Sequence, residues 1–221
     1  GGITRSGPSG SYSYTAKVGY ENMPVVFVSF YDAARFANWM ENGQPTGGQS
    51  FATTEAGTYT LYTSGSSTTN IGTRSSSATW FLPTENEWYK AAYHQPAGSG
   101  GPGDSYWLYP TQADSAPNSR PPNAGDANSA NFFRDDSSPD DFLNDGYART
   151  GNTTFYTTTN YLTPVGSYAL ADSYYGTFDQ GGNVSEWTET IYPGNQRVRR
   201  GGYWANGETG LRSSARDAYI P

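Results

Sequence analysis

Few side chains of this protein could do nucleophilic or redox chemistry. The sequence contains no cysteine and a single histidine, His94. A catalytic nucleophile needs a neighbouring base to activate it, and neither a Cys–His pair nor a second histidine exists to form such a pair. His94 falls at the end of an expected helix, where a cation favours the helix dipole. We interpret it as structural or solvent-facing.

Carboxylate pairs are the remaining route to catalysis, because two acidic side chains can do glycosidase-type acid–base work. Glu85 and Glu87 are better explained as first-turn and capping residues of a helix. Five aspartates further along the chain are interpreted as a solvated loop: Asp135, Asp136, Asp140, Asp141 and Asp145. We therefore predict no catalytic residue.

The segment DQGGNVSEW, from Asp179 to Trp187, is the best candidate for a metal site. Calcium takes about six to eight oxygen ligands, including carboxylates and backbone carbonyls. Glycines allow the backbone to turn its carbonyls inward. The alternative is that Asp179 and Glu186 only accept hydrogen bonds from nearby backbone N–H groups.

The C-terminal run suits an adaptable binding surface, because Tyr, Ser, Asn and Gly are the residues that adaptable paratopes use. A plain loop would have a similar composition. The predicted ligand-binding residues are Tyr203, Trp204, Ala205, Asn206, Gly207, Glu208, Thr209, Asp217 and Tyr219, with Trp107 and Tyr109 as neighbouring aromatics. Three nearby arginines could form an anion clamp, but we expect them to stack on aromatics and pair with carboxylates at a sheet edge: Arg197, Arg199 and Arg200.

Two helices are expected to position these segments. A β-like run starts at Val25, and Ser29 and Asp32 then form a capping box, with Gly43 as the left-handed stop. The inner face of this helix is expected to carry Ala33, Phe36, Ala37 and Met40. Thr84 and Glu87 cap a second helix that ends before Pro96, with core residues at Trp88, Ala91 and Ala92.

Short strands and long loops make up the rest of the expected structure. Residues 1–22 are expected to be extended and punctuated by turns. Residues 46–79 indicate a hairpin with a long irregular loop, and residues 95–160 are too polar and irregular for regular elements throughout. Strands are expected at 59–62, 165–168, 184–187 and 197–202.

Composition narrows the class of protein. The chain has 221 residues, of which 34% are hydrophobic and 15% charged, with a net charge of −7. The negative charge gives no electrostatic basis for nucleic acid binding. No stretch approaches the roughly 20 apolar residues that span a bilayer. The absence of cysteine fits a cytosolic protein and many bacterial surface proteins equally well. Scarce lysine and a Ser/Thr/Gly/Tyr-rich composition favour an extracellular or cell-surface location.

Five segments resemble, in order and spacing, the formylglycine-generating sulfatase-modifying domain: PVVFVSFYDAARFANW, FLPTENEWYKAA, TPVGSY, GTFDQGGNVSEWTE and RRGGYW…LRSSAR. The resemblance implies an α+β fold, the formylglycine-generating-enzyme-like variant of the C-type lectin fold, loop-rich, with two helices around a small antiparallel sheet. It implies one domain over residues 1–221. Family members normally begin with a further strand and helix and close with a further strand, which this sequence is expected to lack.

The resemblance also bears on cofactors. The family's enzyme oxidises a substrate cysteine with copper held by two cysteines after the RGG motif, and relatives that make sulfoxides hold iron on three histidines. The matching stretch here, from Ala205 to Leu211, offers only hard oxygen ligands or amides, whereas Cu(I) selects thiolates. No copper is expected. A structural calcium carries over to Asp179, the carbonyls of Gly182 and Val184, and Glu186, and a second calcium site, between residues 131 and 160, has no evident acidic ligand.

These observations lead to one preferred function and two alternatives. The frame RGGYW…LRSSAR is similar to the variable segment of diversity-generating-retroelement target proteins, which use this fold to hold changeable contact residues. We therefore expect a non-catalytic surface or secreted module that binds an unknown protein or glycan. The alternatives are a structural subunit of an extracellular assembly, with self-assembly, and an oxidative enzyme of the family.

Overall fold

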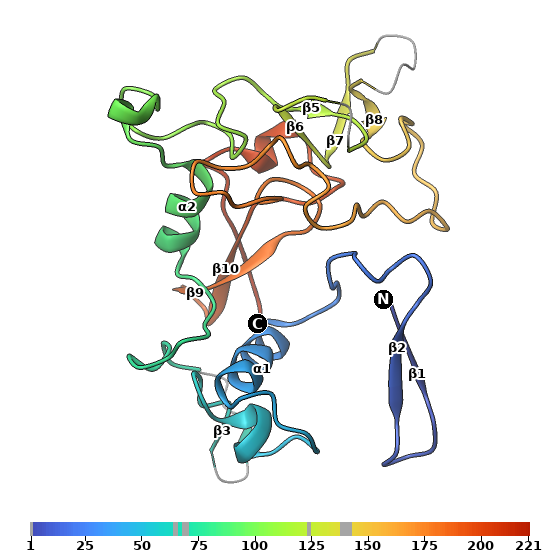
Figure 1. Cartoon of the computed structure of the whole chain (residues 1–221), viewed down its shortest axis with the longest axis vertical. Helices are drawn as coiled ribbons and strands as arrows, with labels where there is room; N and C mark the ends of the chain where they lie inside the picture. The colour runs from blue at the N-terminus through green and yellow to red at the C-terminus, as the bar shows by residue number, and fades with distance from the viewer. Residues whose placement is uncertain (1, 64–65, 68–70, 123–124, 138–142) are drawn as a thin grey trace. The chain divides into compact units, whose positions relative to one another are not determined.

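A computed structural model of the chain describes residues 2–63, 66–67, 71–122, 125–137 and 143–221 (Figure 1). The contacts between Cα atoms divide the chain into two compact units. The first unit contains Gly1–Phe27, Tyr89–Glu186 and Gly201–Ala215, and the second contains Val28–Trp88, Trp187–Arg200 and Arg216–Pro221. None of the helices in the described ranges is long and apolar enough to cross a membrane.

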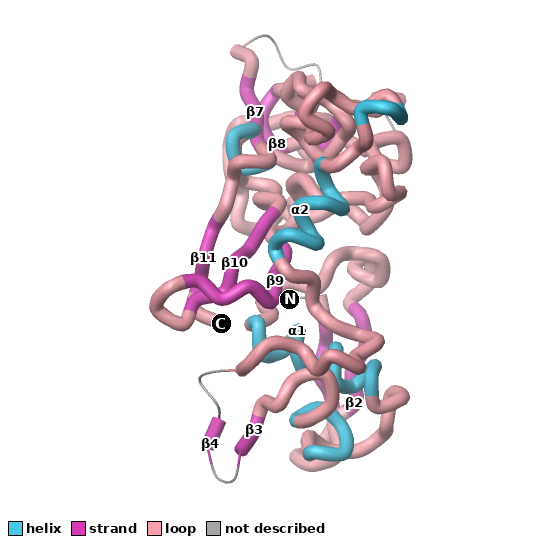
Figure 2. Tube along the Cα trace, turned by 90° about the vertical axis from the view of Figure 1, so that its left-hand side faces the viewer, coloured by secondary structure: helices cyan, strands magenta, loops and turns pink. Residues whose placement is uncertain are grey.

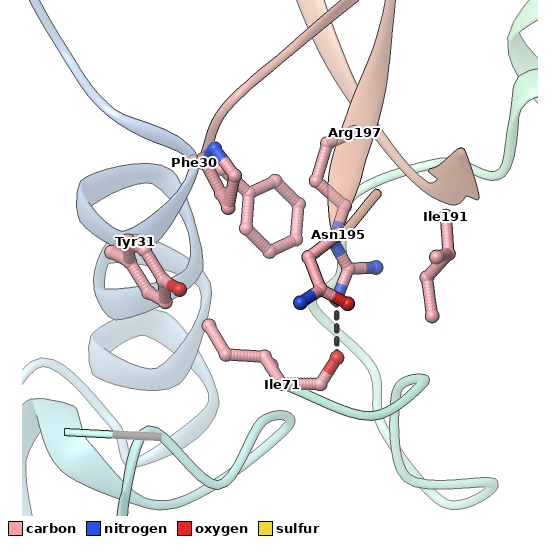
Figure 3. Close-up of a pocket in the computed structure, with 7 residues that line it drawn as sticks. Phe30, Tyr31, Ile71, Ile191, Asn195 and Arg197 are labelled. Atoms are coloured by element: carbon pink, nitrogen blue, oxygen red, sulfur yellow. Dashed lines mark hydrogen bonds between the residues drawn. The ribbon is translucent and has the colours of Figure 1, made fainter. Parts of the chain in front are cut away.

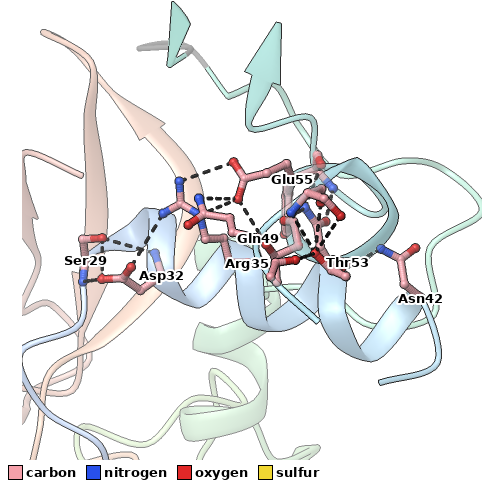
Figure 4. A network of polar contacts seen from close by, with 12 residues as sticks. Ser29, Asp32, Arg35, Asn42, Gln49, Thr53 and Glu55 are labelled. Atoms are coloured by element: carbon pink, nitrogen blue, oxygen red, sulfur yellow. Dashed lines mark hydrogen bonds and ion pairs between the residues drawn. The ribbon is translucent and has the colours of Figure 1, made fainter. Parts of the chain in front are cut away.

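Helix α1 (Phe30–Glu41) of the second unit begins and ends as its sequence predicts. The Ser29 hydroxyl accepts a hydrogen bond from the Asp32 amide at 3.1 Å, and the Asp32 carboxylate accepts one from the Ser29 amide at 3.0 Å (Figure 4). Gly43 follows the helix with a φ of 79°. Capping is local chemistry, which explains why the sequence alone located both ends.

The buried face of α1 is only partly the one that we predicted: Ala37 is buried as expected, Ala33 and Met40 are partly buried, and Phe36 is not buried. Its buried residues are Phe30, Ala34, Ala37 and Asn38, whereas Phe36 is 61% exposed. The Asn38 amide donates to the carbonyls of Thr54 and Tyr59, and its side-chain oxygen accepts from the Tyr59 amide at 2.7 Å. This polar side chain therefore faces inward because it ties a loop to the helix, and it rotates the buried face away from Phe36.

The sheet of the second unit has three antiparallel strands in the order β11-β10-β9 (Figure 2). They are β9 (Glu186–Tyr192), β10 (Gln196–Arg200) and β11 (Asp217–Tyr219), with Val198 paired to Ala218. The predicted strand at 197–202 corresponds to β10. The strand predicted at 184–187 begins only at Glu186 and runs further, to Tyr192.

The core of the second unit is aromatic and surrounds Phe30, which is fully buried. The Phe30 ring makes edge contacts with Tyr59 at 6.4 Å and Trp187 at 6.2 Å. The buried Arg197 guanidinium lies 4.4 Å from the Phe30 ring centre and donates to the carbonyls of Glu189 and Ile71, beside a small pocket (Figure 3). Burial lowers the pKa of Arg197. A stacked and hydrogen-bonded arginine of this kind is structural, as predicted.

The loop after α1 is held by polar contacts. It contains the π-helix Phe51–Glu55, and the Glu55 carboxylate accepts a 2.8 Å bond from Arg35 and a 2.7 Å bond from Gln49 (Figure 4). Beyond it, β3 (Tyr62–Thr63) pairs with β4 (Ser66–Ser67). The predicted hairpin in 46–79 is therefore present, although the predicted strand at 59–62 overlaps β3 only at Tyr62.

Helix α2 (Glu85–Tyr93) also begins at its predicted capping box. The Glu87 carboxylate accepts a 2.7 Å bond from the Thr84 amide, and the Thr84 hydroxyl accepts a 3.2 Å bond from the Glu87 amide. Trp88 and Ala92 are buried as predicted, and Tyr93 joins them at 1% exposure. Ala91 is only partly buried.

The first unit is mostly loop, as predicted for residues 95–160. Its strands pair two by two, with β5 and β6 parallel and the other pairs antiparallel. The elements are β1 (Ile3–Ser6), β2 (Ser13–Ala16), β5 (Asn118–Ser119), β6 (Ser129–Ala130), β7 (Phe133–Asp135), β8 (Asp145–Tyr147) and two short 3-10 helices, Ala97–Ser99 and Glu208–Leu211. Its small apolar core consists of Tyr109, Ala130, Phe132 and Leu211.

Three local predictions in the first unit are wrong. Residues 165–168 form a turn rather than a strand, because Gly166 adopts a φ of 72°. The run from Val25 is not a strand, and Phe27 in it has a φ of 61° and is 91% exposed. Asp145 is not solvated, since only 3% of it is exposed, whereas Asp135 and Asp136 are exposed; Asp140 and Asp141 lie outside the described residues.

Candidate functional site

The loop that carries most of the predicted ligand-binding residues is shaped by Asn206. Its side-chain oxygen accepts a 2.9 Å hydrogen bond from the backbone N–H of Tyr203, and its backbone N–H donates to the Tyr203 carbonyl at 2.8 Å. Its carbonyl accepts a 2.9 Å bond from Phe133. Gly202, at a φ of 71°, lies so close that an added Cβ would be 2.9 Å from the Gly210 carbonyl oxygen. Asn206 therefore holds the loop in this shape, and its contact with a ligand stays a prediction.

Trp204 belongs to a stack of aromatic rings. Its indole lies 4.7 Å from the Tyr161 ring and 5.9 Å from the Phe155 ring, at interplanar angles of 13° and 11°. Tyr147 contacts the same indole at 5.6 Å, and the Trp204 amide donates to the Asn183 carbonyl at 3.2 Å. Offset stacking at such distances favours a fixed orientation of the rings. The stack gives the loop a rigid base.

Part of this stack faces solvent. Phe155 is 51% exposed, Tyr156 52% and Tyr203 41%, whereas Tyr161 beneath them is 4% exposed. Tyr203 meets Trp204 edge to face at 5.9 Å. We call Phe155, Tyr203 and Trp204 the aromatic surface. Exposed rings on a buried base resemble the anchors that supply most of the energy of protein interfaces.

The remaining predicted residues of this loop differ in what they offer. Gly207 and Thr209 are exposed, and Ala205 is partly buried. Glu208 lies 3.6 Å from Arg134 and 3.5 Å from Arg212. Ion pairs as exposed as these contribute little to stability, so the Glu208 carboxylate can exchange partners at low cost.

Two predicted neighbours of the surface do not join the stack. Tyr109 is 1% exposed, and its hydroxyl accepts a 3.0 Å bond from Arg212, so its assignment to a ligand face is wrong. Trp107 is partly buried and donates to Gln95 at 2.8 Å. Both residues serve the interior of the first unit.

Asp217 and Tyr219 lie in the second unit, on strand β11. Arg199 pairs with the Asp217 carboxylate and places its guanidinium 4.5 Å from the Tyr219 ring centre. On the same unit, Arg216 lies 2.5 Å from Glu85 and Arg200 3.7 Å from it. The expectation that Arg199 and Arg200 pair with carboxylates and stack on aromatics is confirmed.

His94 also has a structural partner. Its Nδ1 lies 2.7 Å from the Tyr175 hydroxyl, and the two rings are stacked at 5.9 Å. Tyr106 packs against the imidazole edge at 5.0 Å. These contacts agree with the interpretation of His94 as structural.

The segment predicted to hold calcium has a tightly turned backbone. Asp179, Gly182 and Asn183 all have positive φ, at 58°, 80° and 59°. An added Cβ on Gly182 would be 2.2 Å from the Asn131 carbonyl oxygen, so only glycine fits there. Asn183 donates through its side chain to the Thr163 carbonyl at 3.1 Å and accepts from the Thr163 amide and from Asn131.

The Asp179 carboxylate suits a cation. It accepts a hydrogen bond from the Gly166 amide, and none of the ion pairs among the described residues includes it. Burial raises the pKa of Asp179, because its negative charge is incompletely compensated. In the described part of the chain no three acidic or histidine side chains gather to hold a metal. A calcium ion here would therefore depend on backbone carbonyls, which the turned segment can supply.

The sequence interpretation missed the aromatic partners of Trp204. Phe155 and Tyr161 lie, with Tyr156 between them, in the stretch NTTFYTTTNY, which was interpreted only as part of an irregular polar loop. Three aromatic residues within seven positions of a threonine-rich loop were the available signal. Their meeting with Trp204 depends on tertiary structure alone.

Comparisons with known proteins agree with this fold. The family described as the sulfatase-modifying factor enzyme 1-like domain matches residues 5–221. The crystal structure of CarF is similar, with a TM-score of 0.53 and 22% sequence identity over 93% of this chain. This chain spans 65% of the length of that protein. No curated protein matches the sequence significantly.

Proposed function

This chain belongs to the sulfatase-modifying factor enzyme 1-like family, and we propose that it is a non-catalytic member of this family that binds a protein or glycan through its aromatic surface. The family's catalytic cysteines are absent, since the 221 residues contain no cysteine. Without thiolates, the stretch after the RGG motif has no soft ligand for Cu(I).

The observation that carries the proposal is the exposure of rings on a fixed base. Phe155 and Tyr203 are 51% and 41% exposed, although both contact the stacked Trp204. Aromatic side chains supply a large contact area at a low entropic cost because they have few rotatable bonds. Thr209 and Glu208 add polar groups on the same loop.

The test begins with a screen of the purified protein against immobilised glycans and peptides. For any ligand found, Tyr203→Ala and Phe155→Ala are each expected to weaken binding by about tenfold or more, which corresponds to about 1.4 kcal/mol. Tyr174→Ala is the matched control, because Tyr174 is also 41% exposed but contacts Tyr175 instead. Unchanged binding in both surface variants, or turnover of a thiol-containing peptide, would contradict the proposal.

We also propose that the first unit binds a structural calcium ion with Asp179, the carbonyls of Gly182 and Val184, and Glu186. The half-buried Asp179 carboxylate supports this assignment, because it forms no ion pair with any of the described residues. Calcium is expected to raise the melting temperature of the wild type but not of Asp179→Asn. The control is Asp104→Asn, because Asp104 is exposed. The site would be rejected if elemental analysis of protein never exposed to chelator finds no bound calcium and isothermal titration shows no calcium binding.

The proposed location is extracellular or at the cell surface. The composition supports it, with only 13 lysine and arginine residues in all and many Ser, Thr, Gly and Tyr residues. Fractionation of cells that express the full-length gene tests it, and recovery of the protein in the cytosol alone would contradict it.

A further inference from the structure

The hairpin of β1 and β2 has two chemically different faces. Side chains of a strand alternate between faces, so the pairs Ile3–Ala16 and Arg5–Tyr14 share one face. The Arg5 guanidinium lies 4.5 Å from the ring centre of Tyr12, which extends this face. The opposite face carries only hydroxyl side chains, of Thr4, Ser6, Ser13 and Thr15. The hairpin is therefore amphipathic.

The apolar face of the hairpin is uncovered. Every residue of both strands is exposed, with Ile3 at 57% and Tyr14 at 62%. Within the described residues, the sheet consists of these two strands only. A two-stranded hairpin is at best marginally stable in water, and unpaired edges readily pair with other chains. We therefore expect the apolar face of this hairpin to be covered by a partner surface.

Charge indicates what the cover would be. Residues 1–20 contain Arg5 and Lys17 but no acidic residue, whereas the whole chain has a net charge of −7. The hairpin is thus a basic segment of an otherwise acidic protein. A second copy presents the complementary charge, for example at the adjacent and exposed Asp135 and Asp136. Opposite surface charges steer two molecules together and fix their orientation.

We propose that the β1–β2 hairpin is a self-association surface, which docks through Ile3, Arg5 and Tyr14 on the acidic surface that Asp135 and Asp136 form on a second copy of this chain. The proposal goes beyond the ligand-binding function, because none of these residues belongs to the aromatic surface. It makes the ligand-binding module the subunit of an assembly.

Sedimentation velocity over a concentration series tests the proposal. At low salt the wild type is expected to form a species heavier than the 23.9 kDa monomer as concentration rises, and high salt should weaken it. Arg5→Glu and Tyr14→Ser should each weaken association by about tenfold or more. Lys90→Glu is the charge-matched control, because Lys90 is exposed on α2 and the variant changes the net charge equally. It should associate as the wild type does.

Charge reversal on the acidic side identifies the partner surface. Asp135→Lys with Asp136→Lys should also weaken self-association. Mixing this variant with Arg5→Glu should restore it, because the intact hairpin of one chain then meets the intact acidic surface of the other, and combining all three changes in one chain should restore part of it. A monomer at every concentration in low salt would overturn the proposal. So would hydroxyl-radical footprinting that finds Tyr14 protected in the dilute monomer, because the hairpin would then be covered by its own chain.

Discussion

The two units of this protein differ in how their buried backbone groups are hydrogen-bonded and packed. The second unit has a helix, a three-stranded sheet and an apolar core of Phe30, Ala34, Ala37, Tyr59, Leu61 and Ile71. The first unit has long loops and a smaller core, and its interior also contains buried amide and hydroxyl side chains: Ser119, Asn131, Asn144 and Asn183.

These polar side chains replace the hydrogen bonds that regular elements provide. The Ser119 hydroxyl donates to the carbonyl of Phe132 at 2.7 Å, and the Ser119 amide donates to Asn144 at 2.8 Å. Buried N–H and C=O groups must find partners, and loops have no ladder to supply them. The buried asparagines of the first unit are therefore structural, and they hold the loops on which the aromatic surface lies.

The largest effect is expected in the apolar core of the second unit. Phe30→Ala removes a fully buried ring that contacts Tyr59, Trp187 and Arg197, and should lower the free energy of unfolding by about 3–5 kcal/mol. Denaturant unfolding measures this loss. Phe36→Ala is the control, because Phe36 is 61% exposed on the same helix, and an equal loss in the two variants would contradict the assigned core.

A smaller effect is expected from the polar interior of the first unit. Asn183→Ala leaves the Thr163 amide and carbonyl without their side-chain partner, which should cost about 1–3 kcal/mol. The variant should also weaken calcium binding, because Asn183 holds the turned segment. Asn86→Ala, at an exposed position of α2, should change stability little. Equal free energies of unfolding in the two variants would mean that amide side chains do not replace the backbone hydrogen bonds of regular elements.

The smallest expected effect is a pH dependence of opposite sign in the two units. The hydrogen bond from Arg74 is the main cause that lowers the pKa of Glu87 below 4.5, so Glu87 stabilises the fold at neutral pH and this contribution is lost as pH falls through the lowered pKa. Burial raises the pKa of Asp179 above 3.8, so without calcium its contribution is lost as pH rises through the raised pKa.

Urea unfolding from pH 3 to pH 7 in chelator measures both signs. Glu87→Gln should reduce the loss of stability in acid, whereas Asp179→Asn should raise stability at neutral pH relative to the wild type. Glu87 is 47% exposed, so its effect is the weaker one. A stabilising effect of Glu87→Gln at pH 7 would contradict the sign assigned to the second unit.

Local signals in the sequence predicted much of the fold. Both helices begin at Ser or Thr caps with an acidic residue three positions later, and neither cap depends on distant residues. The predicted buried face of α1 was wrong at Phe36, because Asn38 faces inward only when residues 54–59 lie beside it. The strand predicted at 165–168 was wrong, because alternation in so short a segment cannot outweigh a glycine turn.

The candidate site was predictable in part. Tyr203, Trp204 and Thr209 follow from composition, but their partners Phe155 and Tyr161 are far along the chain and carry no mark of the contact. Tyr109 was misassigned because the sequence does not distinguish an aromatic residue in a core from one that faces a ligand.

The sequence by itself determined the family, the helix caps and the absence of cysteine, because each depends on residue identity or on neighbours within a few positions. Only the tertiary structure decided which aromatic rings are exposed, which asparagines are buried and which hairpin face is uncovered. Burial is a property of residues that meet from distant parts of the chain, and spacing along the sequence does not record it.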